Sequence, residues 1–327
     1  MRTFVGIAAI ACSLACAPAF PISDNDLAGL AREAALGSAP ARAAVESMAR
    51  DGDALAEHAM GLMYLSGKGV PQDTAQAVEW FLRAARKGHV ESAHNLGVIY
   101  ERSSGALHAP GEALRWYRYG AERGFARSQA NLGHMLMQGI GVSADMREAR
   151  DWIEKSAAQG EPRALYLLGM LVLEGRAGLE QSAQEAARLV RLAAESDERD
   201  AQYRLALLYG RGTGVEKSDA EALRWLRKAA EARNPDAEYL LGTIYATGHF
   251  GQKRDDAAAA DWLRRAARQG HLDAQLSLGL AYAEGRGVPV DASEAYGWLL
   301  AAAAKGHPVA VELVDRIKSG IAKPPAQ

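Results

Sequence analysis

One dipeptide recurs along the chain at a nearly constant interval. Leu-Gly, or a close variant, returns every 36 or 37 residues, and the tryptophans keep the same interval. An interval in this range is typical of helical repeat proteins, in which one unit cannot bury its apolar face alone and stacks on its neighbours. The glycines are Gly61, Gly97, Gly133, Gly169, Gly242 and Gly279, with Ala206 in one place; the tryptophans are Trp80, Trp116, Trp152, Trp225, Trp262 and Trp298, with Leu189 in one place.

The glycine content, 33 of 327 residues, is high for an Ala- and Leu-rich chain. An interior helical glycine costs about 1 kcal/mol relative to alanine, so a helical chain must place its glycines at special positions. A turn motif, Gly-x-Gly-Val, accounts for many of them and predicts where one helix of each unit ends before the next begins. The motif occurs at residues 67–70, 139–142, 212–215 and 285–288, and in a form one residue longer at 175–178 and 248–251.

The second helix of each predicted unit has a recognisable start. Seven residues before the tryptophan position stands an Asp or Ser, an N-cap residue worth about 1 kcal/mol. In the second unit Pro110 at the first helical position takes over this role. The fourth unit has Asp197 where a glycine is expected after the helix, which leaves the local geometry there open. The predicted caps are Asp73, Asp145, Ser182, Ser218, Asp255 and Asp291.

Taken together, these features resemble the Sel1-like repeat, a relative of the tetratricopeptide repeat. The full motif is nearly complete from Ala56 to His89 and again from Ala274 to His307. The resemblance implies an all-α protein, a right-handed α/α solenoid (superhelix) of about seven Sel1-like helix-turn-helix repeats over residues 53–307. We expect an N-terminal helical cap at 20–52, including a half unit from Ala43 to Gly52, and a C-terminal capping helix and tail at 308–327.

The first residues have the features of a secretory signal peptide. Arg2 precedes an uncharged apolar stretch, and Ala17-Pro18-Ala19 is a small-x-small ending, so we predict a signal peptide at residues 1–19. Cys12 and Cys16, the two cysteines, lie within it. A lipoprotein would use Cys16, but no large aliphatic residue stands three positions before it. We therefore predict a periplasmic or secreted protein, in a Gram-negative cell or by a eukaryotic secretory route, with no transmembrane segment in the mature chain.

Composition and motifs argue against several classes of function. The formal charge of −2 disfavours a nucleic-acid partner, because binding a phosphate backbone needs a cationic face. Gly-x-Ser-x-Gly, His-Glu-x-x-His and Ser-x-x-Lys motifs are absent from the sequence. His89, Glu91 and His94 could suggest a metal site, but His89 lies at a repeat junction and His94 on the next helix. We expect no cofactor, no metal site and no catalytic residue.

The concave face predicted by the resemblance supplies the candidate binding residues. Positions three before and one after the repeat glycine should point into it, with positions six before and four after flanking them. Tyrosine and arginine are enriched in binding hot spots, and paired asparagines and arginines suit a carboxylate or a peptide backbone. The alternatives are that the rings only pack between helices and that the asparagines bond their own scaffold. The candidates are His58, His94, Asn95, Arg127, Asn131, Arg163, Tyr166, Tyr203 and Tyr239.

Three hypotheses of function follow from the sequence. The first is an exported, non-enzymatic scaffold or adaptor that binds a partner protein or peptide on the concave face, in periplasmic signalling or envelope assembly. The second, by resemblance to cysteine-rich secreted Sel1-like proteins, is a cell-wall protein that binds or hydrolyses peptidoglycan or β-lactams. The third is a purely structural envelope protein. The identity of the partner and the oligomeric state stay open, because one repeat scaffold serves unrelated pathways.

Overall fold

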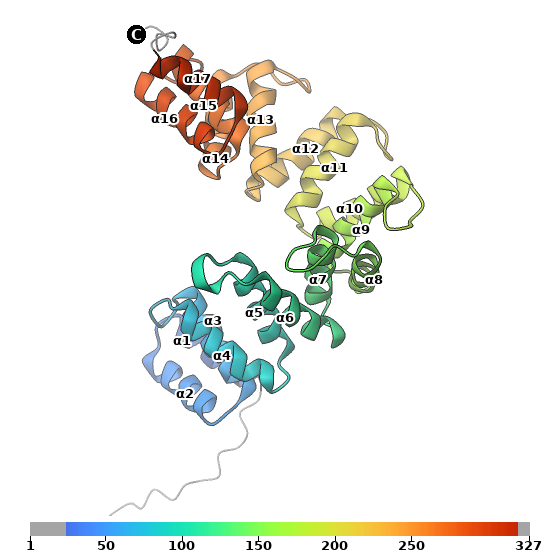
Figure 1. Ribbon diagram of the computed structural model, residues 1–327, viewed down its shortest axis with the longest axis vertical. Coiled ribbons are helices and arrows are strands. Elements are labelled where there is room, and N and C mark those ends of the chain that lie inside the picture. Colours follow the sequence, from blue (N-terminus) through green and yellow to red (C-terminus); the bar gives the residue numbers. More distant parts are fainter. Residues whose placement is uncertain (1–23, 320–327) are drawn as a thin grey trace, which may run out of the picture. The chain divides into compact units, whose positions relative to one another are not determined.

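The computed structural model describes residues 24–319 (Figure 1). The predicted signal peptide lies outside this range. Within the range, the chain forms α-helices, one short 3-10 helix and no strand, which confirms the all-α prediction. The helices are α1 (Asp24–Ala35), α2 (Ala39–Arg50), α3 (Ala54–Ser66), α4 (Thr74–Arg86), α5 (Val90–Arg102), η1 (Gly105–Leu107), α6 (Pro110–Glu122), α7 (Ala126–Gln138), α8 (Met146–Ala157), α9 (Pro162–Glu174), α10 (Ala183–Glu195), α11 (Arg199–Arg211), α12 (Asp219–Glu231), α13 (Pro235–Thr247), α14 (Asp256–Arg268), α15 (Leu272–Glu284), α16 (Ala292–Ala304) and α17 (Pro308–Lys318).

The chain divides into two compact units, residues 1–116 and 117–327, and the boundary falls inside α6. In the second unit, each odd-numbered helix from α7 to α15 packs on the even-numbered helix that follows it, and each pair packs on the next. We call these the first and second helices of a pair. In the first unit, α3 packs on α4 in the same way and α2 on α3. Each unit is therefore a stack of helix pairs, as the solenoid prediction requires.

The second helices begin at the predicted residues. The side chains of all six predicted caps accept a hydrogen bond from the backbone N–H three residues further on, at 2.9–3.3 Å. Pro110 is the first residue of α6, as predicted. These bonds satisfy N–H groups that a helix start otherwise leaves unpaired.

The repeat glycine allows the two helices of a pair to approach closely. A Cβ atom added at Gly133 on α7 would lie 2.6 Å from Cγ1 of Ile153 and 2.9 Å from the carbonyl oxygen of Ala149, both on α8. The glycine that ends the turn serves a different contact. Gly214 has a φ of 69°, and a Cβ there would lie 1.9 Å from the carbonyl oxygen of Ala183. The turn after α11 thus packs directly on the start of α10, the second helix of the previous pair.

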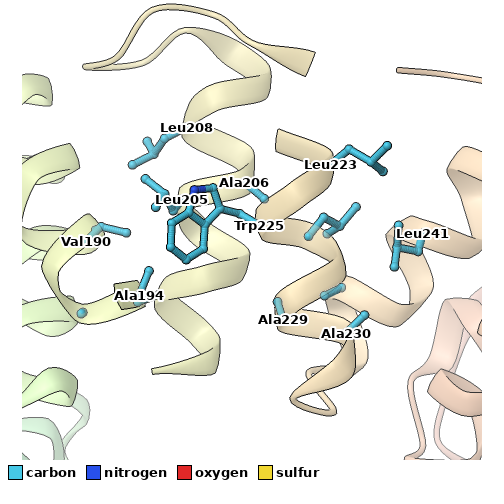
Figure 2. Packing of buried hydrophobic residues seen from close by; sticks show 14 of the residues in the cluster. Val190, Ala194, Leu205, Ala206, Leu208, Leu223, Trp225, Ala229, Ala230 and Leu241 are labelled. Carbon is cyan, nitrogen blue, oxygen red and sulfur yellow. The ribbon is translucent and has the colours of Figure 1, made fainter. Parts of the chain in front are cut away.

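Tryptophan fills the space between neighbouring pairs. Trp225 on α12 is 5% exposed and belongs to a cluster with residues of α10 and α11 (Figure 2). Val190 and Ala194 of α10 and Leu205 and Leu208 of α11 surround it. Burial of so large a ring contributes several kcal/mol to this part of the core.

Two parts of the chain differ in detail from a regular repeat. Asp197 adopts the left-handed conformation, with φ 62°, and Arg233 does the same with φ 65°. Both stand where Gly88, Gly124, Gly160, Gly270 and Gly306 end the other second helices, so the fourth unit keeps the repeat geometry without its glycine. The N-terminal region has two helices, α1 and α2, where the sequence indicated one half unit from Ala43; Leu27 and Ala34 of α1 pack in one cluster with Met60 and Met63 of α3.

Candidate functional site

A cavity opens on the first helices of three consecutive pairs in the second unit. It is lined by residues of α7, α9 and α11. Its volume of about 340 Å³ lies in the size range of small-ligand pockets. Leu167 and Leu171, which are buried, form its floor together with the half-buried Met137 and Met170. The Met170 sulfur accepts a hydrogen bond from Nε of Arg204 at 3.0 Å. The polar lining residues are His134, Gln138, Arg163, Tyr166, Glu174, Arg176, Glu198 and Asp200. This cavity is the candidate site.

Arg163 and Tyr166, two of the sequence candidates, both line the cavity. They stand one turn apart on α9, and Glu198, the N-cap residue of α11, lies near them. Within residues 24–319, Arg163 and Glu198 form no ion pair within 4.0 Å, and the Tyr166 hydroxyl forms no hydrogen bond. Burial raises the pKa of Glu198, while the Arg163 charge acts in the opposite direction. Burial also raises the pKa of Tyr166.

The charges around the cavity nearly balance. Arg176 forms an ion pair with Glu174, N to O 3.2 Å, at the C-terminal end of α9. Asp200 accepts a hydrogen bond from the side-chain amide of Asn234 at 2.8 Å and forms an ion pair with Arg199, N to O 3.7 Å. Two cations and three carboxylates therefore line one cavity, and a strongly charged ligand of either sign would meet like charges there.

Tyr203 and Tyr239 continue the row of tyrosines beyond the cavity. They occupy the position of Tyr166 on α11 and α13, and both are half-buried. Burial raises the pKa of Tyr203. The ring of Tyr239 stacks on the imidazole of His271 with centroids 4.5 Å apart. One face of the Tyr239 ring thus packs against the next pair, in line with the alternative that these rings pack between helices.

His58 is paired with a histidine that the sequence did not match to it. Its ring lies 4.4 Å from that of His89, the N-cap residue of α5, and the Nδ1 atoms of both lie within 3.0 Å of the Ser92 hydroxyl. Burial, and then the charge of His89, lower the pKa of His58 to about 4. This contact of His58 with His89 joins α3 to the start of α5.

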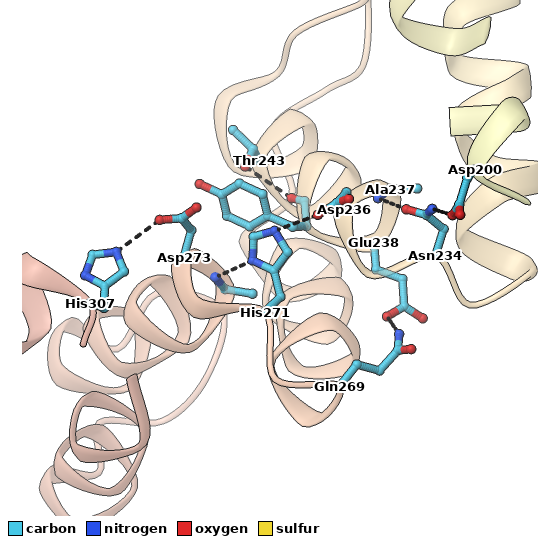
Figure 3. Close-up of polar contacts among 12 residues, drawn as sticks. Asp200, Asn234, Asp236, Ala237, Glu238, Thr243, Gln269, His271, Asp273 and His307 are labelled. Carbon is cyan, nitrogen blue, oxygen red and sulfur yellow. Dashed lines mark hydrogen bonds and ion pairs between the residues drawn. The ribbon is translucent and has the colours of Figure 1, made fainter. Parts of the chain in front are cut away.

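A contact between neighbouring pairs recurs at one repeat position (Figure 3). The residue six before the repeat glycine meets the N-cap residue of the next first helix. Nε2 of His271 lies 3.3 Å from Asp236, and Nε2 of His307 lies 3.0 Å from Asp273. Arg127 and Glu161 occupy the same two positions in an earlier pair, but here the cation is on the first helix and the carboxylate is the N-cap residue; Nε of Arg127 lies 3.9 Å from Glu161. The Arg127 side chain is exposed. Residues at this position thus join repeats, and only Arg163 among them faces the cavity without an ion pair in the described range.

The other candidates lie outside the cavity. Asn131 is 7% exposed, so its amide offers a partner little surface. Asn95 and His94 are half-buried on α5, in the first unit. None of these three lines the cavity on α7, α9 and α11, and their role in binding stays a prediction.

Sequence reasoning missed several lining residues. His134 and Met170 occupy the position one after the repeat glycine, which the resemblance places on the same face, and that position was the available signal. Glu198 could be recognised only as an N-cap residue. Glu174 is the last residue of α9 and Arg176 stands in the turn after it, and neither position carries a binding signal in the repeat pattern.

Residues 24–319 contain neither a cluster of metal ligands nor a membrane-spanning helix. No group of three or more His, Cys, Asp or Glu side chains is arranged there to hold a metal ion. No helix in this range has the length and apolar character needed to cross a bilayer.

Comparisons with known proteins identify the repeat. The Sel1 repeat model matches seven times, at residues 54–89, 90–125, 126–161, 162–198, 199–234, 235–271 and 272–307. A Sel1 repeat protein from Oxalobacter formigenes shares 31% identity over 90% of this chain and 87% of its own, with a TM-score of 0.63. A protective antigen of uropathogenic Escherichia coli strains, which displays an SLR fold, shares 30% identity over 91% of this chain and 68% of its own, with a TM-score of 0.55.

A search of curated proteins finds no match. Sel1 repeat folds are typical of non-catalytic scaffolds for protein–protein interaction. Because seven matches cover the chain from residue 54 to 307, the protein belongs to the Sel1 repeat family.

Proposed function

We propose that this protein is an exported, non-enzymatic scaffold that binds a partner protein or peptide on the face formed by its first helices, the predicted concave face. The observation that carries the proposal is the row of half-buried tyrosines, Tyr166, Tyr203 and Tyr239, on three consecutive first helices. Tyrosine offers a large amphipathic surface at low entropic cost, which suits a binding face. The cavity beside Tyr166 adds a recessed site to that row.

Export is the part of the proposal that rests on the first 19 residues. Expression of the full chain in a Gram-negative host, followed by fractionation and mass spectrometry, tests it. We expect a periplasmic product that begins at Phe20. A full-length cytoplasmic product would refute export, and an acylated Cys16 at the N-terminus would show a lipoprotein instead.

Partner binding is tested by cross-linking capture from an envelope fraction, with the captured protein then purified and its affinity measured. Tyr203→Ala with Tyr239→Ala removes two rings of the row and is expected to weaken binding at least about tenfold. The matched control is Leu192→Ala with Leu300→Ala, two apolar side chains that are 39% and 41% exposed on the second helices α10 and α16. Equal affinity of wild type and tyrosine variant would refute this face.

Because Tyr239 also packs on His271, the tyrosine variant needs a check of its fold. Thermal unfolding followed by circular dichroism supplies it. Tyr203→Ala alone is the second variant, since within residues 24–319 the Tyr203 hydroxyl has no hydrogen-bond partner to lose. The cell-wall alternative is tested by incubation with labelled penicillin and peptidoglycan fragments, and we expect neither labelling nor turnover.

A further inference from the structure

The chemistry of the cavity on α7, α9 and α11 indicates what kind of ligand it accepts. Its floor consists of Leu167, Leu171 and the thioether side chains of Met137 and Met170. Thioether side chains adjust to different shapes, and here the Met170 sulfur also accepts a hydrogen bond from Arg204. Such a floor suits a long, flexible aliphatic side chain. It gives no directional contact by itself, so the polar groups at the rim must orient the ligand.

The polar lining residues, which we call the rim, include a hydrogen-bond donor on α9, Arg163, and an acceptor at the start of α11, Glu198. The Arg163 guanidinium only donates, and the Glu198 carboxylate only accepts when ionised. In the described part of the chain neither is taken up by an ion pair within 4.0 Å, and the Tyr166 hydroxyl beside them can do both. A main-chain amide presents a carbonyl acceptor and an N–H donor close together, which complements this pair.

The charges around the cavity disfavour a ligand group that carries a net charge of either sign. A lysine or arginine side chain would be drawn to Glu198 and Asp200 but would meet Arg163, and an acidic side chain would meet the opposite conflict. A dipolar group without net charge avoids both. The peptide backbone is such a group, and an extended segment also exposes its side chains for insertion.

We propose that this cavity binds an extended peptide segment of the partner, with the main chain held between Arg163 and Glu198 and one long aliphatic side chain, of the Leu or Met type, inserted onto the floor of Met137 and Met170. This assignment rests on the proposed scaffold function and names the feature of the partner that the scaffold recognises.

The test is a titration of the purified full chain with capped peptides of the form acetyl-Gly-Gly-Xaa-Gly-Gly-amide, where Xaa is Leu, Met, Ala, Lys or Glu. Methionine methyl NMR reads out the site directly, because Met137 and Met170 line it and Met60 and Met63 in the first unit serve as internal references. Met137→Leu and Met170→Leu assign the two signals. We expect saturable shifts of both, with Leu and Met peptides binding about tenfold more tightly than the Ala peptide.

Variants of the rim separate backbone recognition from simple burial. Arg163→Ala is expected to weaken the Leu peptide about tenfold and Glu198→Gln about threefold. The matched control is Arg127→Ala, the same repeat position one pair earlier and outside the cavity lining, which should change affinity less than twofold. Equal effects of Arg163→Ala and Arg127→Ala would overturn the assignment of the backbone contact.

Three other outcomes would overturn the proposal. They are absence of shifts at Met137 and Met170 for every peptide, tighter binding of the Lys or Glu peptide than of the Leu peptide, and free leucine binding as tightly as the capped peptide, which would show an amino-acid site. If partner capture still depends on Tyr203 and Tyr239 in any of these cases, the scaffold function stands and only the cavity assignment fails.

Discussion

The Nε2 atom of His271 lies 3.3 Å from a carboxylate oxygen of Asp236, on the first helix of the preceding pair. The other ring nitrogen, Nδ1, accepts the backbone N–H of Ala274 at 3.2 Å and so caps α15. An Nδ1 atom that accepts a hydrogen bond carries no proton, so the ring proton lies on Nε2, the atom that faces Asp236. One imidazole therefore starts a helix and joins two repeats.

Replacing His271 should cost both contacts. We expect His271→Ala to lower the free energy of unfolding by about 1–2 kcal/mol, from the lost cap and the lost contact with Asp236. Urea unfolding followed by circular dichroism measures it. Asp236→Asn keeps an oxygen that faces Nε2 and should cost less than about 0.5 kcal/mol; a cost as large as that of His271→Ala would mean that the charge of Asp236 joins the pair.

A methyl group at the repeat glycine should separate the helices of a pair. We expect Gly133→Ala to destabilise the protein by about 2–4 kcal/mol, because the added Cβ collides with Ile153 and with a backbone oxygen of α8 that cannot move alone. Gly297 on α16 is the control, since nothing lies within 4 Å of a Cβ added there. Gly297→Ala should stabilise by up to about 1 kcal/mol. Similar effects of the two substitutions in thermal melts would contradict the close contact.

The contribution of the repeat tryptophan to the free energy of unfolding should differ from one repeat to another. Trp225 is 5% exposed within the cluster of α10, α11 and α12, whereas Trp298 is half-buried on α16 and donates its ring N–H to Glu294 at 3.0 Å. We expect Trp225→Ala to cost about 3–5 kcal/mol and Trp298→Ala clearly less. Guanidinium unfolding of the two variants measures the difference, and equal losses would show that Trp298 is as deeply packed in solution.

Acid should act on the pair of His58 and His89. The pKa of His58 is lowered from 6.5 to about 4, so between these values the unfolded chain binds a proton that the folded chain does not. Stability therefore falls as pH is lowered from about 6.5 toward 4 and does not change through this group at higher pH. His58→Leu should flatten the slope of melting temperature against pH in that window. An unchanged slope would show that His58 is not the group responsible.

The sequence was sufficient for the fold because each repeat carries its own local signals. The caps at Asp73 and Asp145 and the close-contact glycines fix the register of every pair within the pair itself. Helix α1 lies within the predicted N-terminal helical cap, but its bounds could not be predicted because it has neither a repeat glycine nor a turn motif; Leu27 and Ala34 pack it against α3. Asp197 could not be assigned because a left-handed aspartate is rare but tolerated.

The candidate site was only partly predictable for the opposite reason. Arg163 and Tyr166 follow from their repeat positions, but the cavity also needs His134 from the preceding pair and Glu198 from the following one. Whether residues from three successive repeats leave a cavity between them or fill the space depends on the volume and packing of their side chains. The repeat period and the spacing of the motifs do not determine side-chain packing.

The side-chain contacts between neighbouring pairs also mean that one repeat cannot simply replace another. Asn234 matches Asp200, His271 matches Asp236 and His307 matches Asp273, whereas Arg127 faces Glu161 with the polarity reversed. A repeat moved to another place in the array would bring its N-cap residue against the wrong neighbour, such as Glu161 against an aspartate. The seven repeats share one architecture, yet at these four junctions a pair of side chains distinguishes one neighbour from another.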